Sequence, residues 1–335
     1  MIHSALIAFS VLISGCMPFA DGKNRQGLSR PIRADHHVHL NSPAIQAFVP
    51  DYCQAVARFG DCDPALTTVR TSADLLQAMD NARVRRAVLL SNGYLAESGT
   101  VTPRRRDAAE LMRAANDWTV SQARFYPDRL AAFIAVDPTQ PTALPEIKRW
   151  SRNPAVAGVK LHLTASGTDF RNDADVAALA AVFRAAAEER FAILIHLRTR
   201  RMDYGSADVR RFVADALPAA GASPVQIAHL GGWGQIDNPT LEALGAFAHA
   251  IEGSPDRLPN LLFDLSGALT DQTSMAHPHA VAALIHRIGA GRFLPGSDWP
   301  FTTDLVRLYE PFYPGLPLLN SEIELIRGNV APCLK

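Results

Sequence analysis

The feature of this sequence that most constrains its fold is a regular alternation of short apolar runs with longer segments of helical periodicity. Eight runs rich in aliphatic and β-branched residues recur along the chain. They are Ile32 to Leu40, Val84 to Ser91, Leu130 to Asp137, Val156 to Leu163, Phe191 to Leu197, Val225 to Leu230, Leu261 to Ser266 and Phe293 to Asp298. Continuous apolar runs of this kind are typical of parallel strands that are buried on both faces. The chain is therefore predicted to be an α/β protein with a parallel sheet.

Helices with apolar residues at helical spacing are predicted after five of these strands. They are Asp107 to Tyr126, Asp173 to Arg190, Ala207 to Leu217, Thr240 to Glu252 and Pro278 to Ile288. Because crossovers are right-handed and eight such units close naturally, we expect a (β/α)8 TIM barrel rather than an open doubly wound sheet. The long insert after the first strand, Asn41 to Asn81, is expected to form a subdomain or lid over the barrel mouth.

The N-terminus is expected to be an export signal. The apolar stretch from Ala5 to Ile13 has the length of a signal-peptide core and is too short to span a bilayer. Ile13-Ser14-Gly15-Cys16 resembles the bacterial lipobox, in which the cysteine is acylated. We therefore expect residues 1–15 to be a signal peptide, 16–30 a tether and 31–335 the barrel domain of a lipoprotein, anchored at Cys16 on the periplasmic side of a bacterial membrane. An ordinary signal cut near Ala20, which would give a soluble exported protein, is the alternative because no Lys or Arg precedes the apolar stretch.

The charge balance and the cysteines exclude some classes of function. Lys and Arg together number 33, as do Asp and Glu, so the chain has no broad basic field and nucleic acid is not an expected partner. Cys53 and Cys62 are close enough in sequence to form a disulfide, in which case Cys333 would have no partner for a second one. None of these cysteines has the paired Cys-x-x-Cys spacing of a zinc or redox site. Whether the first two are bridged stays open.

Polar residues gather at the predicted carboxyl ends of the strands, where a TIM barrel has its active site. His37 and His39 lie two residues apart in the first strand, so they share one face. His196 ends the fifth strand, His229 the sixth and Asp298 the eighth. One buried histidine alone is most simply a core residue bonded to backbone, but four histidines and a carboxylate are most simply satisfied by a divalent cation. Three or four such ligands with room for water indicate a catalytic site, most simply of zinc.

These motifs resemble the amidohydrolase superfamily, and within it the amidohydrolase-related group that includes amino-carboxymuconate-semialdehyde decarboxylase. The resemblance spans about Ile32 to Leu334 and rests on Asp35-His36-His37-Val38-His39, Gly158-Val159-Lys160-Leu161-His162, Ile195-His196, His229-Leu230-Gly231-Gly232, Gly296-Ser297-Asp298-Trp299-Pro300 and Gly328-Asn329. It implies that His37, His39, His196 and Asp298 are the metal ligands, with His229 beside them. A second metal would be held if Lys160 were carboxylated, but a single metal is commoner in the related group, so Lys160 is expected to be an unmodified pocket residue, with His162 facing the same way.

The expected mechanism is attack by a metal-activated water. Asp298 is the candidate for handling the proton, and His229 for binding the developing oxyanion or orienting the water. Trp233 and Trp299 are expected to wall the pocket. Arg198 lies two residues beyond His196 and is the candidate for holding an anionic substrate through its planar fork. The other loop arginines are Arg104 to Arg106, Arg200 and Arg201, for which solvation or pairing with a nearby carboxylate is the simpler account.

Three functions remain open on the sequence alone. Hydrolysis of an amide, ester or lactone of a small anionic substrate is the first choice, on superfamily frequency. Non-oxidative decarboxylation of an unsaturated carboxylic acid is the second, because the same group contains both reactions. A lipid-anchored metal-binding protein without turnover is the third, and the intact ligand set argues against it.

Overall fold

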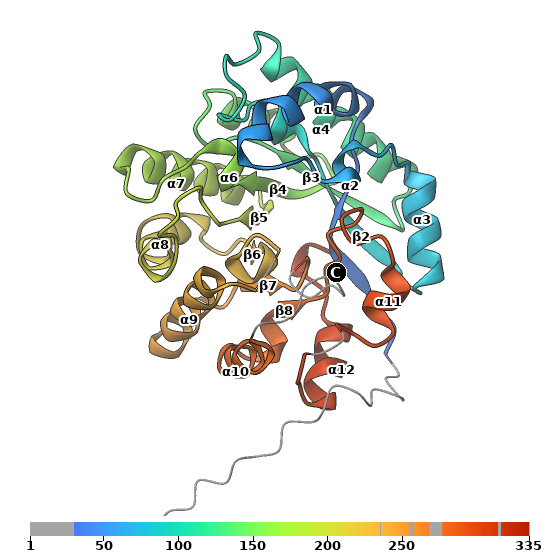
Figure 1. The fold of residues 1–335 in the computed structure, drawn as a ribbon, viewed down its shortest axis with the longest axis vertical. Helices are drawn as coiled ribbons and strands as arrows, with labels where there is room; N and C mark the ends of the chain where they lie inside the picture. The colour runs from blue at the N-terminus through green and yellow to red at the C-terminus, as the bar shows by residue number, and fades with distance from the viewer. Residues whose placement is uncertain (1–29, 235, 255–257, 268–276, 314–315, 335) are drawn as a thin grey trace, which may run out of the picture.

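The strands of the protein form one closed parallel sheet. The computed structural model describes residues 30–234, 236–254, 258–267, 277–313 and 316–334. Within it the strands follow one another around the sheet in chain order: β1 (Ala34–His39), β2 (Arg86–Leu90), β3 (Leu130–Ala135), β4 (Val156–His162), β5 (Ala192–His196), β6 (Val225–Ile227), β7 (Leu261–Asp264) and β8 (Phe293–Leu294) (Figure 1). The backbone N–H of His36 donates to Pro295 O at 2.9 Å and returns the last strand to the first. The predicted (β/α)8 barrel is confirmed.

Helices alternate with the strands and form the outer layer. Those that follow β2 to β8 are α4 (Ala108–Phe125), α5 (Ala143–Arg149), α6 (Leu163–Ser166), α7 (Asp173–Glu188), α8 (Ser206–Arg211), α9 (Asn238–Gly253), α10 (Pro278–Ile288), α11 (Leu305–Tyr309) and α12 (Asn320–Gly328). All five predicted helices are present. The third of them ends differently, because α8 continues as a π-helical turn, η3 (Phe212–Ala216), and a 3-10 turn, η4 (Leu217–Ala220).

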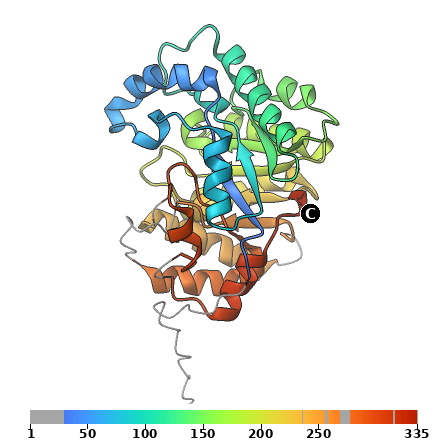
Figure 2. The same ribbon diagram turned by 90° about the vertical axis from the view of Figure 1, so that its right-hand side faces the viewer.

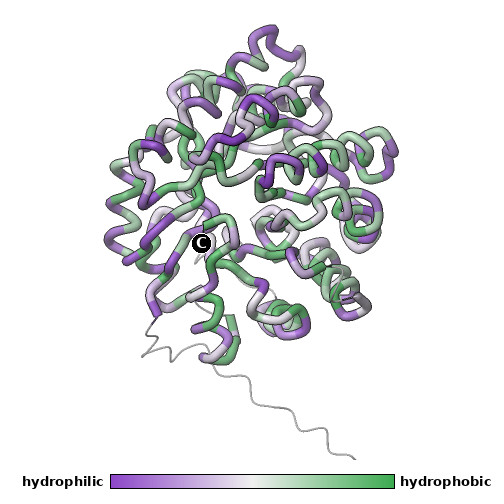
Figure 3. Tube along the Cα trace, turned by 180° about the vertical axis from the view of Figure 1, so that it is seen from behind, coloured by the Kyte–Doolittle hydropathy of each residue, from purple (hydrophilic) through white to green (hydrophobic). Residues whose placement is uncertain are grey.

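The barrel has an outer and an inner core. The outer one lies between the sheet and the helices. Figure 3 shows hydrophobic and hydrophilic stretches alternating along these helices. The inner one is built from alternate strand residues, including Ala34, Val88, Phe133 and Leu194. Leu334, in the C-terminal turn η8 (Pro332–Leu334), packs into the same cluster. The end of the chain therefore seals the inside of the barrel.

The insert after β1 is helical. It contains α1 (Pro43–Val56), α2 (Pro64–Thr67) and α3 (Ser72–Asn81). Ile45 and Phe48 of α1 pack with Leu95, which follows β2, and with Ala165, which follows β4, so the insert covers part of the carboxyl end of the barrel. Cys53 and Cys62 form a disulfide within it. Figure 2 shows this insert, in blue, on the side of the barrel away from the C-terminal turn.

The predicted signal peptide, the acylation site Cys16 and the tether up to residue 29 lie outside the described residues. In the part of the chain that is described, no helix is long and apolar enough to cross a membrane.

Candidate metal centre

Two histidines and one carboxylate meet at the carboxyl end of the barrel. The Nε2 atoms of His37 and His39 are 3.1 Å apart, and Asp298 Oδ1 lies 3.5 Å from the first and 3.6 Å from the second. Ligands held about 2.1 Å from a tetrahedral ion are about 3.4 Å from one another. The three atoms therefore have the spacing of one ligand set.

Asp298 reaches this point because the loop after β8 pairs with β1. The Asp298 N–H donates to His37 O at 2.8 Å, and the His39 N–H donates to Trp299 O at 2.6 Å. Asp298 has a φ of 61°, in the left-handed region that non-glycine residues seldom adopt. These hydrogen bonds hold the residue there and place its carboxylate beside the two imidazoles.

A buried carboxylate orients His37. Asp264, at the end of β7, lies with Oδ2 3.0 Å from His37 Nδ1. Burial alone would raise the pKa of this carboxyl, but the charge and hydrogen bond of His37 hold it well below its usual range. The charged carboxylate also accepts from Gln226 Nε2 at 2.6 Å and from the backbone N–H of His229 at 3.0 Å. Because His37 donates its Nδ1–H to Asp264, its Nε2 lone pair points to the centre.

His229, the turn residue after β6, is fixed close to His37. Its φ is 54° in the 3-10 turn η5 (Ala228–Gly231), and its Nδ1–H donates to Ser266 O at 2.8 Å. The His229 and His37 rings are 4.7 Å apart between centroids. The Nε2 atom of His229 is therefore the ring nitrogen left to act in the site.

The His196 ring lies 5.0 Å from that of His229, but His196 belongs to neither compact group of ligand atoms. Those groups are His37, His39 and Asp298, and His37, His229 and Asp264. His196 stacks on His162 with centroids 4.0 Å apart and planes 8° apart. Its Nε2 is buried and has no hydrogen-bond partner. Leaving a buried acceptor without a hydrogen bond costs free energy of folding. The unpartnered Nε2 atom of His196, together with the three convergent ligand atoms, therefore fits a site that takes a divalent ion.

Lys160 and His162 end β4 as predicted and differ in surroundings. Lys160 Nζ lies 3.4 Å from His37 Nε2, and burial lowers the pKa of its amine to about 8. His162 Nδ1 accepts from the backbone N–H of Ala165 at 3.2 Å and so begins α6. Lys160 is therefore part of the candidate metal centre, whereas the His162 ring packs beside it against His196.

Several residues of the site are missed by the sequence analysis. They are Asp264, Gln226 and Ser266 behind His37, Tyr94, whose ring is 4.8 Å from that of His162, and Phe301, whose ring is 6.4 Å from that of His39. Burial, with the charge of Asp298 adding to it, raises the pKa of the Tyr94 hydroxyl well above its ordinary value. Asp264 could have been found, because it is a carboxylate two residues before the end of the predicted strand Leu261 to Ser266. Tyr94 follows β2 in a loop without a regular pattern.

The amidohydrolase family model matches residues 34–311 of the chain. The chain belongs to the amidohydrolase family. No curated protein is significantly similar to this amidohydrolase in sequence.

Solved structures with the same fold include several decarboxylases. One is 5-carboxyvanillate decarboxylase from Sphingomonas paucimobilis, with a TM-score of 0.59 and 16% identity over 89% of this chain and 97% of that one. Another is 2,6-dihydroxybenzoate decarboxylase in complex with 2,6-dihydroxybenzoate, with a TM-score of 0.62 and 16% identity over 88% of this chain and 96% of that one. A third is dihydroxybenzoic acid decarboxylase from a Polaromonas species with manganese and the inhibitor 2-nitroresorcinol. It has a TM-score of 0.56 and 14% identity over 88% of this chain and 94% of that one. At these identities the likeness establishes the fold.

The arginine predicted to hold the substrate is engaged in an ion pair. Arg198 Nη1 lies 2.8 Å from both carboxylate oxygens of Asp237, and its guanidinium stacks 4.6 Å from the Trp233 ring. Trp233 is 52% exposed and Trp299 is buried. Four of the other loop arginines also have partners. Arg104 donates to Gln140 and Arg200 to Ala165 O, whereas Arg105 pairs with Asp51 and Asp107, and Arg201 with Asp169 and Asp203. Arg106 is exposed.

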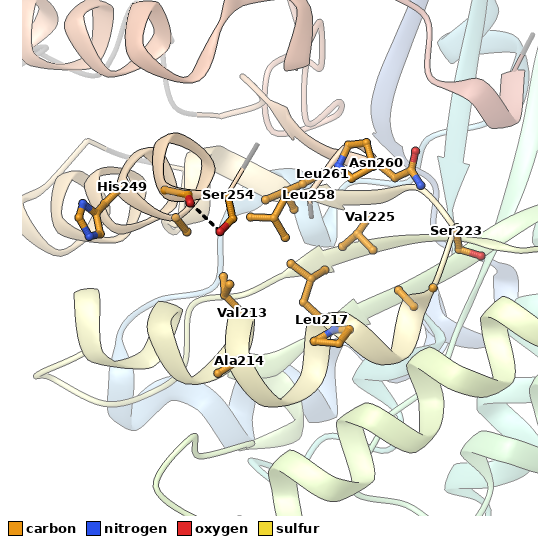
Figure 4. Close-up of a pocket in the computed structure, with 16 residues that line it drawn as sticks. Val213, Ala214, Leu217, Ser223, Val225, His249, Ser254, Leu258, Asn260 and Leu261 are labelled. Atoms are coloured by element: carbon orange, nitrogen blue, oxygen red, sulfur yellow. Dashed lines mark hydrogen bonds between the residues drawn. The ribbon is translucent and has the colours of Figure 1, made fainter. Parts of the chain in front are cut away.

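A cavity of ≈710 Å³ lies at the opposite end of the amidohydrolase barrel, between η4 and α9 at the starts of β6 and β7 (Figure 4). Its walls are largely apolar, with Val213, Leu217, Val225 and Leu258 among them. His249 is the one titratable side chain among its described lining residues. It therefore lacks the groups of a catalytic site.

Proposed function

We propose that this amidohydrolase is a metal-dependent lyase that decarboxylates a small unsaturated or aromatic carboxylic acid. The observation that carries the proposal is the convergence of His37, His39 and Asp298 within one ligand sphere. The decarboxylases among the structural neighbours support a lyase over the hydrolase that superfamily frequency favours.

The residues of the site suit proton delivery to carbon. A bound divalent ion would supply positive charge that orients an anionic substrate and stabilises charge built up in the reaction. The Asp298 side chain is 16% exposed, whereas that of His37 is fully buried, so Asp298 faces the space where a substrate enters. The Asp298 carboxylate relays a proton from solvent to the carbon that bears the substrate carboxylate. The bond between that carbon and the carboxylate then breaks, its electron pair returns to the ring or double bond, and CO₂ leaves.

His229 and the aromatic walls position the substrate in this scheme. With its Nδ1–H given to Ser266 O, His229 can accept a hydrogen bond from a substrate hydroxyl at Nε2. Tyr94, whose ring lies 4.8 Å from that of His162, is an aromatic side chain that could pack against an aromatic substrate. Lys160 is a further candidate for contact with the substrate carboxylate.

The identity of the metal belongs to the proposal. The sequence predicts zinc, and two of the structural neighbours carry manganese. Two imidazoles and a carboxylate accept either ion. Elemental analysis of protein purified without added metal distinguishes them.

A product assay tests the reaction. The purified protein, with Zn²⁺ or Mn²⁺, is given hydroxybenzoates, unsaturated carboxylic acids, and esters, amides and lactones of the same acids. We expect CO₂ release from a carboxylic acid by the wild type and its loss in Asp298→Asn. Release of an acid, alcohol or amine without CO₂ would instead establish the hydrolase, and no turnover of any compound by metal-loaded protein would favour the binding protein.

We also propose that the mature chain is anchored through acylated Cys16. The support is the lipobox-like Ile13-Ser14-Gly15-Cys16. Several acyl chains give stable membrane attachment where one is marginal. Cys16→Ser should move the protein from the membrane to the soluble fraction, as followed by immunoblot of cell fractions. A wild-type protein that is fully soluble and begins after Cys16 would contradict this and indicate an ordinary signal peptide.

A further inference from the structure

A second cavity, of ≈650 Å³, opens at the amino-terminal ends of β1, β2 and β8. Three arginines line it: Arg33, Arg85 and Arg86. The remaining described lining residues are apolar or glycine, apart from Asn329, and none of them is acidic. The cavity is thus strongly cationic and lies at the end of the barrel away from the metal centre.

Strand register brings the three arginines together. Ala34 of β1 is paired with Arg86 of β2, and the Arg85 N–H donates to Ile32 O at 3.3 Å. Arg33, directly before β1, therefore lies beside Arg85 and Arg86 at the start of β2. Guanidinium groups stay protonated at physiological pH, so three positive charges share this space.

These cations lack the carboxylate partners that several arginines have at the other end of the barrel. Arg86 Nη1 donates to Leu334 O at 2.7 Å, but its Nε is buried without a hydrogen-bond partner. Among the described residues no carboxylate forms an ion pair with Arg33, Arg85 or Arg86. At the other end of the barrel Arg105, Arg198 and Arg201 each face a carboxylate. The cavity therefore offers its positive charges to a ligand of negative charge.

We propose that this cavity is an anion site for a phosphate-type oxyanion, either free phosphate or the phosphate of an anionic lipid head group. Guanidinium forks bind tetrahedral oxyanions through paired hydrogen bonds, and three of them suit a ligand with up to two negative charges. The lipid source has a geometric argument. Arg30, the first described residue, lies beside Gly328 of the cavity wall, where a Cβ built on Gly328 would be 3.0 Å from Arg30 Nη1. The lipid source rests on the proposed anchoring through Cys16, because Arg30 lies at this end of the barrel.

Calorimetric titration of the mature, metal-loaded protein tests the site with two probes, inorganic phosphate and soluble short-chain phosphatidylglycerol. The double variant Arg33→Gln/Arg85→Gln should weaken binding of at least one probe by tenfold or more. It removes two exposed charges and keeps the Arg86 bond to Leu334 O, so the fold should persist. Arg210→Gln removes one charge from the exposed face of α8 and should leave binding unchanged.

Two further measurements keep the outcome clear. Phosphate can also bind a metal, so the titration is repeated in His37→Ala, where binding at the arginine cavity should remain. Arg86→Lys keeps a charge but loses the planar fork and its bond to Leu334 O. It should weaken binding, and its metal content and Tm without ligand are measured beside it to show that the barrel is still folded. Preference for the lipid probe would identify a head-group site and equal binding a free-phosphate site. Binding of neither probe, binding that survives in the double variant, or binding that disappears in His37→Ala would overturn the proposal.

Discussion

The two ends of the barrel differ in how their charged groups are paired. At the carboxyl end, each charged group of the metal centre faces a group of opposite or ligating character, as His37 does between Asp264 and Asp298. At the amino end, Arg33, Arg85 and Arg86 gather around a cavity whose described walls carry no carboxylate. The comparison separates the two proposed sites: a metal ion at the carboxyl end, where ligand atoms converge, and an anion at the amino end, where three arginines gather.

The strongest test of the carboxyl end removes its central ligand. His37→Ala deletes the imidazole that touches both other members of the ligand set, so we expect loss of stoichiometric metal and of all measurable turnover. Elemental analysis of the purified variant checks the first and the CO₂ assay the second. His249→Ala, in the apolar cavity at the other end, is the matched histidine control. Full metal content in His37→Ala would mean that the ion is held elsewhere.

Asp298→Asn separates proton transfer from metal binding. The amide keeps the size and one ligand oxygen but cannot deliver a proton, so turnover should fall by about 10² to 10⁴-fold. Metal content should stay at or above half of the wild-type level by elemental analysis. An active Asp298→Asn would transfer the proton role to His229, which His229→Gln would then test.

Asp264→Asn probes the support behind the ligands. Without the charged partner of His37 Nδ1, the ring loses its fixed orientation, and metal affinity should drop by about 10 to 100-fold. Competition with a chelator measures it. Asp208→Asn, another buried carboxylate but one that binds Arg171 and the start of α8, should leave metal affinity unchanged. Equal effects of the two variants would reduce the role of Asp264 to general stability.

The smallest effect is expected at Arg198. Its charge is already matched by Asp237, and ion pairs with a partly exposed partner contribute about 1 kcal/mol or less. Arg198→Ala should therefore change kcat/KM by less than about tenfold and lower Tm slightly. A larger rise in KM with an unchanged Tm would instead give Arg198 the substrate-binding role that its sequence position suggests.

Much of this architecture follows from local pattern. The eight strands are visible as apolar runs because both of their faces are buried, and His37 and His39 share a face through the period of two. The partner of Arg198 could not be predicted in the same way, because Arg198 meets Asp237 across 39 positions of sequence. Arg105 and Arg201, in contrast, pair with the nearby carboxylates Asp107 and Asp203, as expected from the sequence. The helices of the insert were also missed, since Pro43, Pro50 and Pro64 suggest a loop whereas Pro43 and Pro64 each begin a helix after a side-chain cap, from Ser42 and Asp63.

The closure of the barrel joins the two ends of the chain, and this has a consequence for the order of folding. The Ala331 N–H donates to His36 Nε2 at 3.0 Å, across 295 positions of sequence, and Asp298 meets His37 through the same seam. The chain must therefore be almost fully synthesised before its first strand finds its last neighbour. Contacts this distant in sequence form late and slowly. Uptake of the ion during refolding would accordingly report the final step, the docking of the last strand, rather than the initial collapse.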